Sequence, residues 1–189
     1  MMDSLILVNR THPLPAPPDP AELAPVDEKH PDILLCRDAR AWLERLLDAV
    51  GARGAIVPVS GFRSRAEQQA IWDSSLAEHG RAFTETYVAR PGCSEHETGL
   101  AIDLAENRPD IDFLCPQFPD EGVCRLFRLA APEFGFVLRY PAGKEHITGI
   151  GHEPWHFRYV GRPHAGEMAL CGLTLEEYWE RRGTRGRAG

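Results

Sequence analysis

Two short stretches of the chain carry residue types that could act together in one reaction. The first contains His96 and Asp103, and the second contains Glu153 and His156. Two imidazoles and a carboxylate suit a catalytic zinc ion, which takes three protein ligands and keeps one position open for water or substrate. We therefore predict a zinc site with His96, Asp103 and His156 as its ligands.

A zinc ion in such a site lowers the pKa of its bound water to about 7, so that hydroxide is available at neutral pH. Two neutral imidazoles and one carboxylate would leave the site with a single net positive charge, which favours a hydroxide or a carbonyl oxygen. Glu153 is left as a general base that takes the proton of the water and delivers it to a leaving amine. These residues together predict hydrolysis.

A second pattern in the same region has to be weighed. His152, Glu153 and His156 match the letters of the H-E-x-x-H metalloprotease motif, in which both histidines share one face of a helix. Pro154 would stand inside that helix and would destabilise it by about 3 kcal/mol. Residues 157–160 also have the composition of a strand. We therefore expect a strand here, with His152 outside the ligand set.

Arg63 lies where a predicted strand turns into a predicted helix. Two roles are open for it, a surface ion pair or a fixed planar charge that stabilises the oxyanion of a tetrahedral intermediate. Gln68 follows in the first turn of the same helix. Its amide group, with the helix N-terminus beside it, could hold the carboxylate of a substrate.

The hydrophobic pattern predicts the elements that position these residues. Strands are expected at 55–59, 100–105, 136–140 and 155–160. Helices are expected at 38–50, from the capping box Ser64–Glu67 to near Gly80, at 123–130, and from a second capping box at Thr174–Glu177. In the second strand Asp103 alternates with larger apolar residues, so it lies on the face that has room for a ligand. This mixture predicts an α+β fold with a small antiparallel sheet flanked by helices.

Length and composition limit the class of protein. One domain over 1–189 is the default for this length, with an extended proline-rich arm over 1–32 and a flexible tail over 183–189. The formal net charge of -7 argues against a nucleic-acid or anionic-membrane partner. Five scattered cysteines without a Cys-x-x-Cys pair predict reduced thiols. No segment is long enough to span a bilayer, and no signal peptide opens the chain, so we expect a cytoplasmic protein without a membrane anchor.

The same residues resemble those of a known family, the zinc D,D-peptidases of the vancomycin-resistance group, which comprises the VanX, VanY and VanXY types. The resemblance is carried by segments 60–68, 94–103, 135–140 and 153–161. Residues 7–14 resemble the start of the cytoplasmic VanXY branch. The resemblance implies an α+β domain shared with the hedgehog signalling domain, one zinc ion, and a small peptide substrate that ends in D-Ala-D-Ala.

It also implies roles for individual residues. The zinc ligands would be His96, Asp103 and His156, the catalytic base would be Glu153, and Arg63 would polarise the scissile carbonyl group. Gln68 and Ser94 would contact the C-terminal D-alanine of the substrate. Tyr140 and Trp155 would form walls of the pocket. The absence of an anchor favours cytosolic substrates, either free D-Ala-D-Ala or a nucleotide-linked pentapeptide.

Two alternatives stay open at this point. The same zinc chemistry would serve an L,D-carboxypeptidase that trims tetrapeptide stems, and a zinc-bearing binding module without turnover would share the fold. The presence of both Glu153 and Arg63 favours an enzyme over a binding module.

Overall fold

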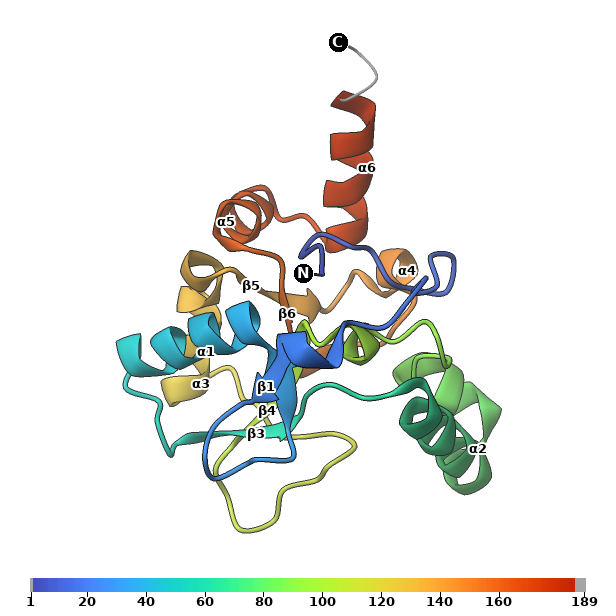
Figure 1. Cartoon of the computed structure of the whole chain (residues 1–189), viewed down its shortest axis with the longest axis horizontal. Helices are drawn as coiled ribbons and strands as arrows, with labels where there is room; N and C mark the ends of the chain where they lie inside the picture. The colour runs from blue at the N-terminus through green and yellow to red at the C-terminus, as the bar shows by residue number, and fades with distance from the viewer. Residues whose placement is uncertain (1, 186–189) are drawn as a thin grey trace.

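Four antiparallel strands form the central sheet of the computed structural model, which describes residues 2–185 (Figure 1). The strands are β3 (Ile56–Ser60), β4 (Ala101–Glu106), β5 (Phe136–Tyr140) and β6 (Glu153–Tyr159). Their order in the sheet is β3-β4-β6-β5, so β4 and β6 lie in the middle. All four strands were predicted, and the antiparallel α+β architecture is confirmed. Pro58 lies in an edge strand next to a register shift, as its missing N–H group requires.

Helices surround this sheet on both faces. The α-helices are α1 (Arg37–Ala49), α2 (Arg65–Tyr87), α3 (Gly122–Ala130), α4 (Glu145–Thr148), α5 (Arg162–Cys171) and α6 (Leu175–Arg185). Short 3-10 helices cover Pro20–Glu22, Glu95–Thr98 and Ala131–Phe134. The sequence predicted α1, α2, α3 and α6, whereas α4 and α5 were not expected.

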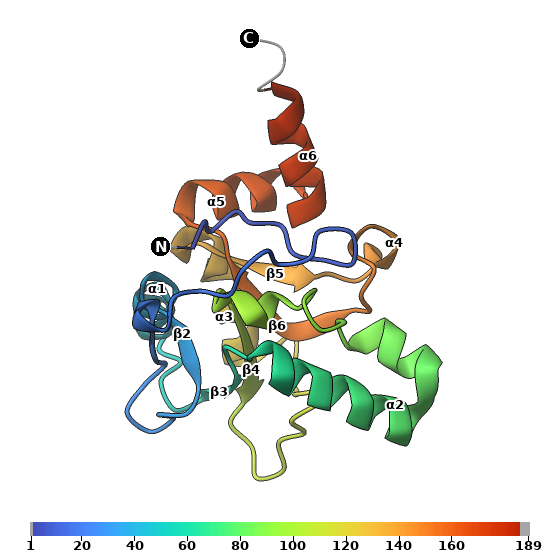
Figure 2. The same ribbon diagram turned by 45° about the vertical axis from the view of Figure 1, so that its right-hand side comes forward.

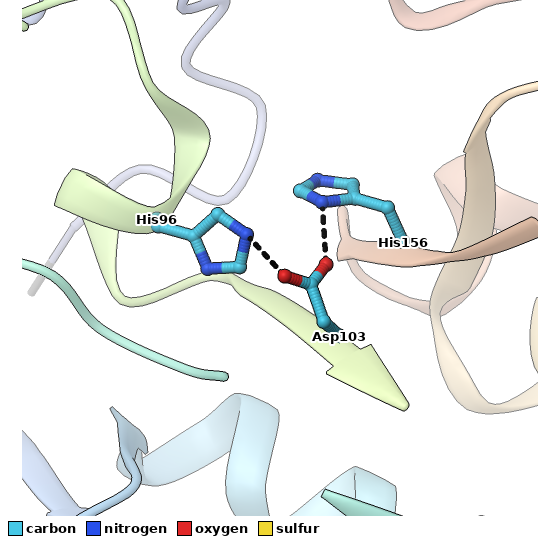
Figure 3. A group of neighbouring side chains, drawn as sticks. All are labelled: His96, Asp103 and His156. Atoms are coloured by element: carbon cyan, nitrogen blue, oxygen red, sulfur yellow. Dashed lines mark hydrogen bonds and ion pairs between the residues drawn. The ribbon is translucent and has the colours of Figure 1, made fainter. Parts of the chain in front are cut away.

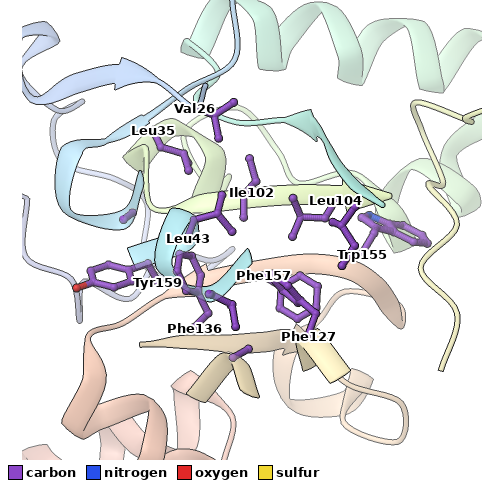
Figure 4. Packing of buried hydrophobic residues seen from close by; sticks show 14 of the residues in the cluster. Val26, Leu35, Leu43, Ile102, Leu104, Phe127, Phe136, Trp155, Phe157 and Tyr159 are labelled. Atoms are coloured by element: carbon purple, nitrogen blue, oxygen red, sulfur yellow. The ribbon is translucent and has the colours of Figure 1, made fainter. Parts of the chain in front are cut away.

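The main hydrophobic core lies between the sheet and helices α1 and α3 (Figure 4). Alternate residues of β4 and β6 point into it, among them Ile102, Leu104 and Phe157, which are almost fully buried. Phe157 packs edge-on against Phe127 of α3, with ring centroids 5.0 Å apart. Because strand side chains alternate between faces, the intervening residues of both strands point to the opposite side of the sheet.

That opposite side carries a second, smaller apolar cluster beneath α5 and α6. Leu7 of the N-terminal segment, Val137 of β5 and Met168 of α5 belong to it. In two views the N-terminal segment runs beside α5 and β5, while α6 projects away from the body of the molecule (Figures 1 and 2). The rest of this face carries small alanines of β4 and the polar side chains of Asp103, His156 and Arg158.

The proline-rich arm contains more structure than expected. Its residues Leu23–Pro25 form a short strand, β1, which pairs with β2 (Leu34–Cys36) in a separate two-stranded sheet. A 3-10 turn precedes β1, with the Asp19 carboxylate capping it. The prediction of an extended arm over 1–32 thus missed the 3-10 turn and the pairing of the arm with β2, the strand that precedes α1.

Helix α2 begins with the predicted capping box, in which Ser64 and Glu67 bond each other's backbone N–H groups. We expected the helix to end near Gly80. Gly80 instead adopts φ 77° and ψ 171°, which kinks the helix, and a second helical segment continues to Tyr87. A hydrogen bond between the buried hydroxyl groups of Ser75 and Thr84 joins the two segments across the kink.

The second predicted capping box is also present, because Thr174 and Glu177 exchange hydrogen bonds at the start of α6. That helix continues to Arg185, into the predicted flexible tail of 183–189, and residues 186–189 lie outside the described part of the chain. Among residues 2–185, no helix combines the length and apolar character needed to cross a membrane. That the whole chain forms one domain stays a prediction.

Candidate metal centre and active site

The register between the two central strands brings two of the predicted ligands together. Asp103 of β4 is the direct cross-strand partner of His156 of β6, and directly opposed residues on one face have neighbouring side chains. Their side chains meet on the polar face, where His156 Nδ1 lies 2.9 Å from Asp103 Oδ1 (Figure 3). This proximity follows from strand pairing alone, although the residues are far apart in sequence.

His96 reaches the same place from the 3-10 helix that precedes β4. Gly99 ends this helix with φ 69°, and a side chain there would come within 2.7 Å of Leu23, so the turn into β4 requires glycine. His96 Nε2 lies 3.1 Å from the second carboxylate oxygen of Asp103. Its other ring nitrogen, Nδ1, bonds the carbonyl oxygen of Gly61 at 2.6 Å. That bond places the ring proton on Nδ1 and leaves the Nε2 lone pair free.

These three residues form a group that could hold a metal ion. One ligand atom from each of His96, Asp103 and His156 lies within 4.8 Å of the others, and all three residues are buried. His96 Nε2 is fully buried and has no hydrogen-bond partner. A buried polar atom without a partner is costly, so an ion bound to this nitrogen would satisfy it. The donor set of two imidazoles and a carboxylate fits zinc.

The electrostatics of His96 and Asp103 agree with this assignment, whereas the burial of His156 is outweighed by the neighbouring carboxylates, which raise its pKa to about 9, so its ring must lose a proton when a metal binds. Burial and the nearby Arg63 guanidinium lower the pKa of His96 to about 4, so its ring is neutral at neutral pH, as a metal ligand must be. Burial raises the pKa of Asp103, but the two imidazoles more than offset this effect and hold it well below its usual value. Asp103 is therefore ionised.

Glu153 stands at the start of β6, and its Oε2 lies 3.8 Å from His156 Nδ1. It is 6% exposed. Burial raises its pKa to about 8, while the charges of His156 and Arg63 act in the opposite direction. A carboxyl group with a pKa near neutrality, beside a candidate metal group, has the properties of a general acid–base catalyst.

Arg63 points into the site from the turn between β3 and α2. Its Nη2 lies 3.6 Å from Asp103 Oδ2, and its Nη1 donates to Gln68 Oε1 at 3.0 Å. Its backbone N–H donates to the carbonyl oxygen of His96. Gln68 is buried and donates from its amide nitrogen to the carbonyl oxygen of Ala89 at 2.8 Å. Arg63 is thus fixed in direction within the site, and its ion pair is with the buried Asp103.

A cavity of about 390 Å³ opens onto this group. All nine predicted site residues line it, including Ser94, Tyr140 and Trp155. The Tyr140 ring lies 4.9 Å from the His156 ring. Parts of the lining were not predicted: residues of one face of α2 and the exposed Phe113 of the segment between β4 and α3. The structure places the nine residues together, and their individual roles stay predictions.

His152 does not belong to the group. Residues 153–159 form a strand, and His152 is exposed, with its Nδ1 bonded to the carbonyl oxygen of Tyr140 at 2.9 Å. The helical H-E-x-x-H interpretation is therefore excluded, for the reason that Pro154 indicated.

Sequence reasoning missed a cluster of buried charges behind the site. Arg139 of β5 and Arg158 of β6 are almost fully buried and both contact Glu95, which is also buried. Each arginine interrupts an apolar strand on the face opposite the core, where a charge needs a buried partner. That interruption was the available signal, but the sequence did not identify the partner.

Two buried imidazoles, a buried carboxylate and an adjacent buried glutamic acid around one cavity define a metallohydrolase type of site. A sequence model of the VanY family, described as D-alanyl-D-alanine carboxypeptidase, matches residues 32–162. The chain belongs to this family, and it is an enzyme of the peptidase class. The predicted family is confirmed.

Individual relatives agree with this family assignment. The bifunctional D-Ala-D-Ala dipeptidase and carboxypeptidase VanXYC of Enterococcus gallinarum is 43% identical over 178 residues, which cover 94% of each chain. The solved structure of the D,D-dipeptidase VanXYg with a D-Ala-D-Ala phosphinate analogue has a TM-score of 0.92 and 51% identity, and the match covers 94% of this chain and 70% of that chain. A variant of the D,D-pentapeptidase VanY from a VanB-type resistance cassette, solved with Zn(II), has a TM-score of 0.80 and 37% identity. The match covers 94% of this chain and 99% of that chain.

Proposed function

We propose that this protein uses one zinc ion to hydrolyse the peptide bond between two terminal D-alanine residues, as a D,D-dipeptidase and D,D-carboxypeptidase on peptidoglycan precursors. The observation that carries the proposal is the convergence of His96, Asp103 and His156 beside Glu153 in one cavity, in a chain of the VanY family. Such a reaction would remove the precursor terminus that vancomycin recognises, which links the protein to antibiotic resistance.

The zinc ion, when bound by the three ligands, would supply a Lewis acid and a water of lowered pKa. Glu153 takes a proton from the water while the oxygen of that water forms a bond to the carbonyl carbon of the substrate. The same carboxyl group then delivers the proton to the amine nitrogen as the C–N bond breaks. Burial favours the neutral form of this carboxyl group, so burial supports the second half of the cycle, in which Glu153 holds the proton until the amine accepts it.

Arg63 stabilises the negative charge that develops on the carbonyl oxygen. Its guanidinium group is already fixed by Gln68 and lies beside Asp103, so it needs little reorganisation in the transition state. Gln68 has a second amide N–H for the substrate carboxylate, and the buried Ser94 lines the same cavity. We assign both to the C-terminal D-alanine.

Tyr140 and Trp155 complete the proposed site as walls of the cavity. Both are largely buried and line it close to His156 and Glu153. Burial raises the pKa of the Tyr140 hydroxyl well above its usual value, so this group remains a hydrogen-bond donor at all working pH values.

The test is an amino-acid release assay with metal analysis. We would measure zinc per chain, and D-alanine released from D-Ala-D-Ala, from a nucleotide-linked pentapeptide and from a tetrapeptide stem. Release from the first or second substrate, with one zinc per chain, supports the proposal. Release from the tetrapeptide alone would identify an L,D-carboxypeptidase, and zinc binding without release from any of the three would identify a binding module. The cytoplasmic location stays a prediction, to be checked by cell fractionation.

A further inference from the structure

Glu95 lies next to a predicted ligand but has no role in the reaction described above. It is 1% exposed. Its Oε1 accepts a hydrogen bond from Arg139 Nε at 2.8 Å and lies 3.0 Å from Arg158 Nη1. Its second oxygen, Oε2, is buried without any hydrogen-bond partner, and it lies 3.6 Å from His156 Nε2. A buried carboxylate oxygen aimed at a ligand side chain needs an explanation.

The two nitrogens of the His156 ring face different residues. Nδ1 lies 2.9 Å from Asp103, on the side where the three predicted ligands converge. Nε2 points to Glu95 and has no hydrogen-bond partner of its own. A ring nitrogen that binds a metal must offer its lone pair, so the ring proton then lies on the other nitrogen. For His156 that nitrogen is Nε2, and Glu95 is the acceptor in front of it.

We propose that Glu95 is a positioning residue for the zinc site: its Oε2 accepts the Nε2–H of His156 and so holds the ring in the tautomer and orientation in which Nδ1 binds the metal. This inference rests on the proposed function, because it assumes that His156 is a zinc ligand. A carboxylate in this position also makes the imidazole a stronger ligand.

His96 provides an internal comparison. The nitrogen of its ring that does not face Asp103 is already bonded to a backbone carbonyl group, that of Gly61. Both histidines thus have the same arrangement, with one nitrogen facing Asp103 and the other facing an oxygen acceptor. They differ in the acceptor, which is a neutral carbonyl group for His96 and a carboxylate for His156.

Glu95 is held in place by residues distant in sequence. Arg139 also bonds both carboxylate oxygens of Glu176 in α6, at 2.9 and 2.6 Å. Arg158 donates to the carbonyl oxygens of Ser4 and Ile6 in the N-terminal segment. Two arginines and two glutamates balance in charge, so the cluster can be buried. This arrangement connects the His156 side of the proposed metal site to α6 and to the N-terminal segment.

The matched substitutions are Glu95→Gln and Glu97→Gln. A glutamine has a single side-chain oxygen, so at position 95 it can accept from the arginines or from His156 but not from both. Glu97 belongs to the same 3-10 helix and is 3% exposed, but its carboxylate oxygens bond Gly92 and Arg65 and not a predicted ligand. Zinc affinity would be measured by competition with a chromophoric chelator, after circular dichroism confirms folding.

We expect Glu95→Gln to weaken zinc binding by about 10- to 100-fold, the usual effect of removing such an outer partner, and Glu97→Gln to leave it within about twofold. Equal affinities for the wild type and Glu95→Gln would overturn the inference. A wild-type protein that binds no zinc would instead overturn the proposed function, and this inference with it.

A second measurement does not depend on how the variant folds. Nitrogen-15 NMR of the zinc-loaded wild type distinguishes protonated from metal-bound imidazole nitrogens. We expect the His156 signal to show a proton on Nε2 and metal on Nδ1. The reverse assignment, in a protein that binds zinc and releases D-alanine, would contradict the role of Glu95 and leave the proposed function intact.

Discussion

Glu153 is a buried acid among charged neighbours, and its burial has consequences for both activity and stability. Burial raises its pKa to about 8 from an ordinary value of 4.5. The carboxylate is therefore unfavourable in the folded protein unless a cation is close by. A bound zinc ion would lower this pKa again through its charge. The same residue thus destabilises the metal-free protein near neutral pH and is the proposed base of the metal-bound enzyme.

For activity, we expect Glu153→Gln to reduce kcat by about 10³-fold, within the range for loss of a general acid–base group. Zinc content should be unchanged, because Glu153 is outside the predicted ligand set. Turnover and zinc per chain would be measured on the same preparation. Substantial turnover in the variant would show that another group is the base.

For stability, the effect of Glu153→Gln should depend on pH. Between about pH 4.5 and 8 the unfolded chain has released the Glu153 proton while the folded chain retains it, so the unfolding free energy of the wild type falls as pH rises. Glutamine has no such proton. In the presence of chelator, the Tm of the variant should therefore exceed that of the wild type by a margin that grows from pH 5 to pH 8. A constant margin would contradict the raised pKa.

Arg63 is predicted to act in the transition state more than in substrate binding. We expect Arg63→Ala to lower kcat by about 10²- to 10³-fold, the scale for loss of one oxyanion donor, with a smaller change in KM. Because Gln68 bonds Arg63, Gln68→Ala should lower kcat to a lesser degree. Steady-state kinetics on D-Ala-D-Ala would check both variants, and an effect of Arg63→Ala on KM alone would argue for a binding role.

At the scale of elements, the central strand pair β4–β6 places the site. Direct pairing of Asp103 with His156 brings two of the proposed ligands together. Gly61 helps to position the third, because its carbonyl oxygen accepts a hydrogen bond from His96. A slip of one residue in this register would send every side chain of the strand to the other face. The apolar core on the opposite face therefore protects the metal site against such slippage.

The strand also decides between the two histidines of the H-E-x-x-H letters. We expect His156→Ala to lose zinc and activity, whereas His152→Ala should retain both, because His152 is exposed and does not line the cavity. Zinc content and D-alanine release would be compared for the two variants. Loss of zinc in His152→Ala would restore the rival motif.

Across the whole molecule, the buried cluster joins elements that are otherwise separate. Glu176 of α6 is 7% exposed and bonds Arg139 with both oxygens, which ties the projecting C-terminal helix to β5. Asn9 of the N-terminal segment donates to the same carboxylate. The N-terminal segment and the start of α6 are therefore fixed to the sheet directly behind the candidate metal site.

Removal of one partner from a buried ion pair leaves an uncompensated charge and costs about 3 kcal/mol or more. We therefore expect Glu176→Gln to lower the unfolding free energy by about 3 kcal/mol in urea titrations. Glu180→Gln, an exposed position of the same helix, should change it by less than about 0.5 kcal/mol. Equal effects of the two substitutions would show that the Arg139 contact does not anchor α6.

Much of the local structure could be predicted because its causes are local. The capping box at Ser64, the alternation around Asp103 and the exclusion of a helix by Pro154 each depend on residues within a few positions of one another. The residue types of the metal group could also be recognised, since imidazole and carboxylate are what zinc requires. The sequence by itself thus determined the main elements, the family and the candidate ligands.

Only the tertiary structure decided how these pieces meet. The pairing of β1 with β2, the second segment of α2 beyond Gly80, and the choice of Glu95 as partner for Arg139 and Arg158 all depend on contacts between distant segments. No local pattern specifies such a contact, because a buried charge signals that it needs a partner without signalling which one. The orientation of His156 between Asp103 and Glu95 is of this kind, since it follows from strand register and packing together.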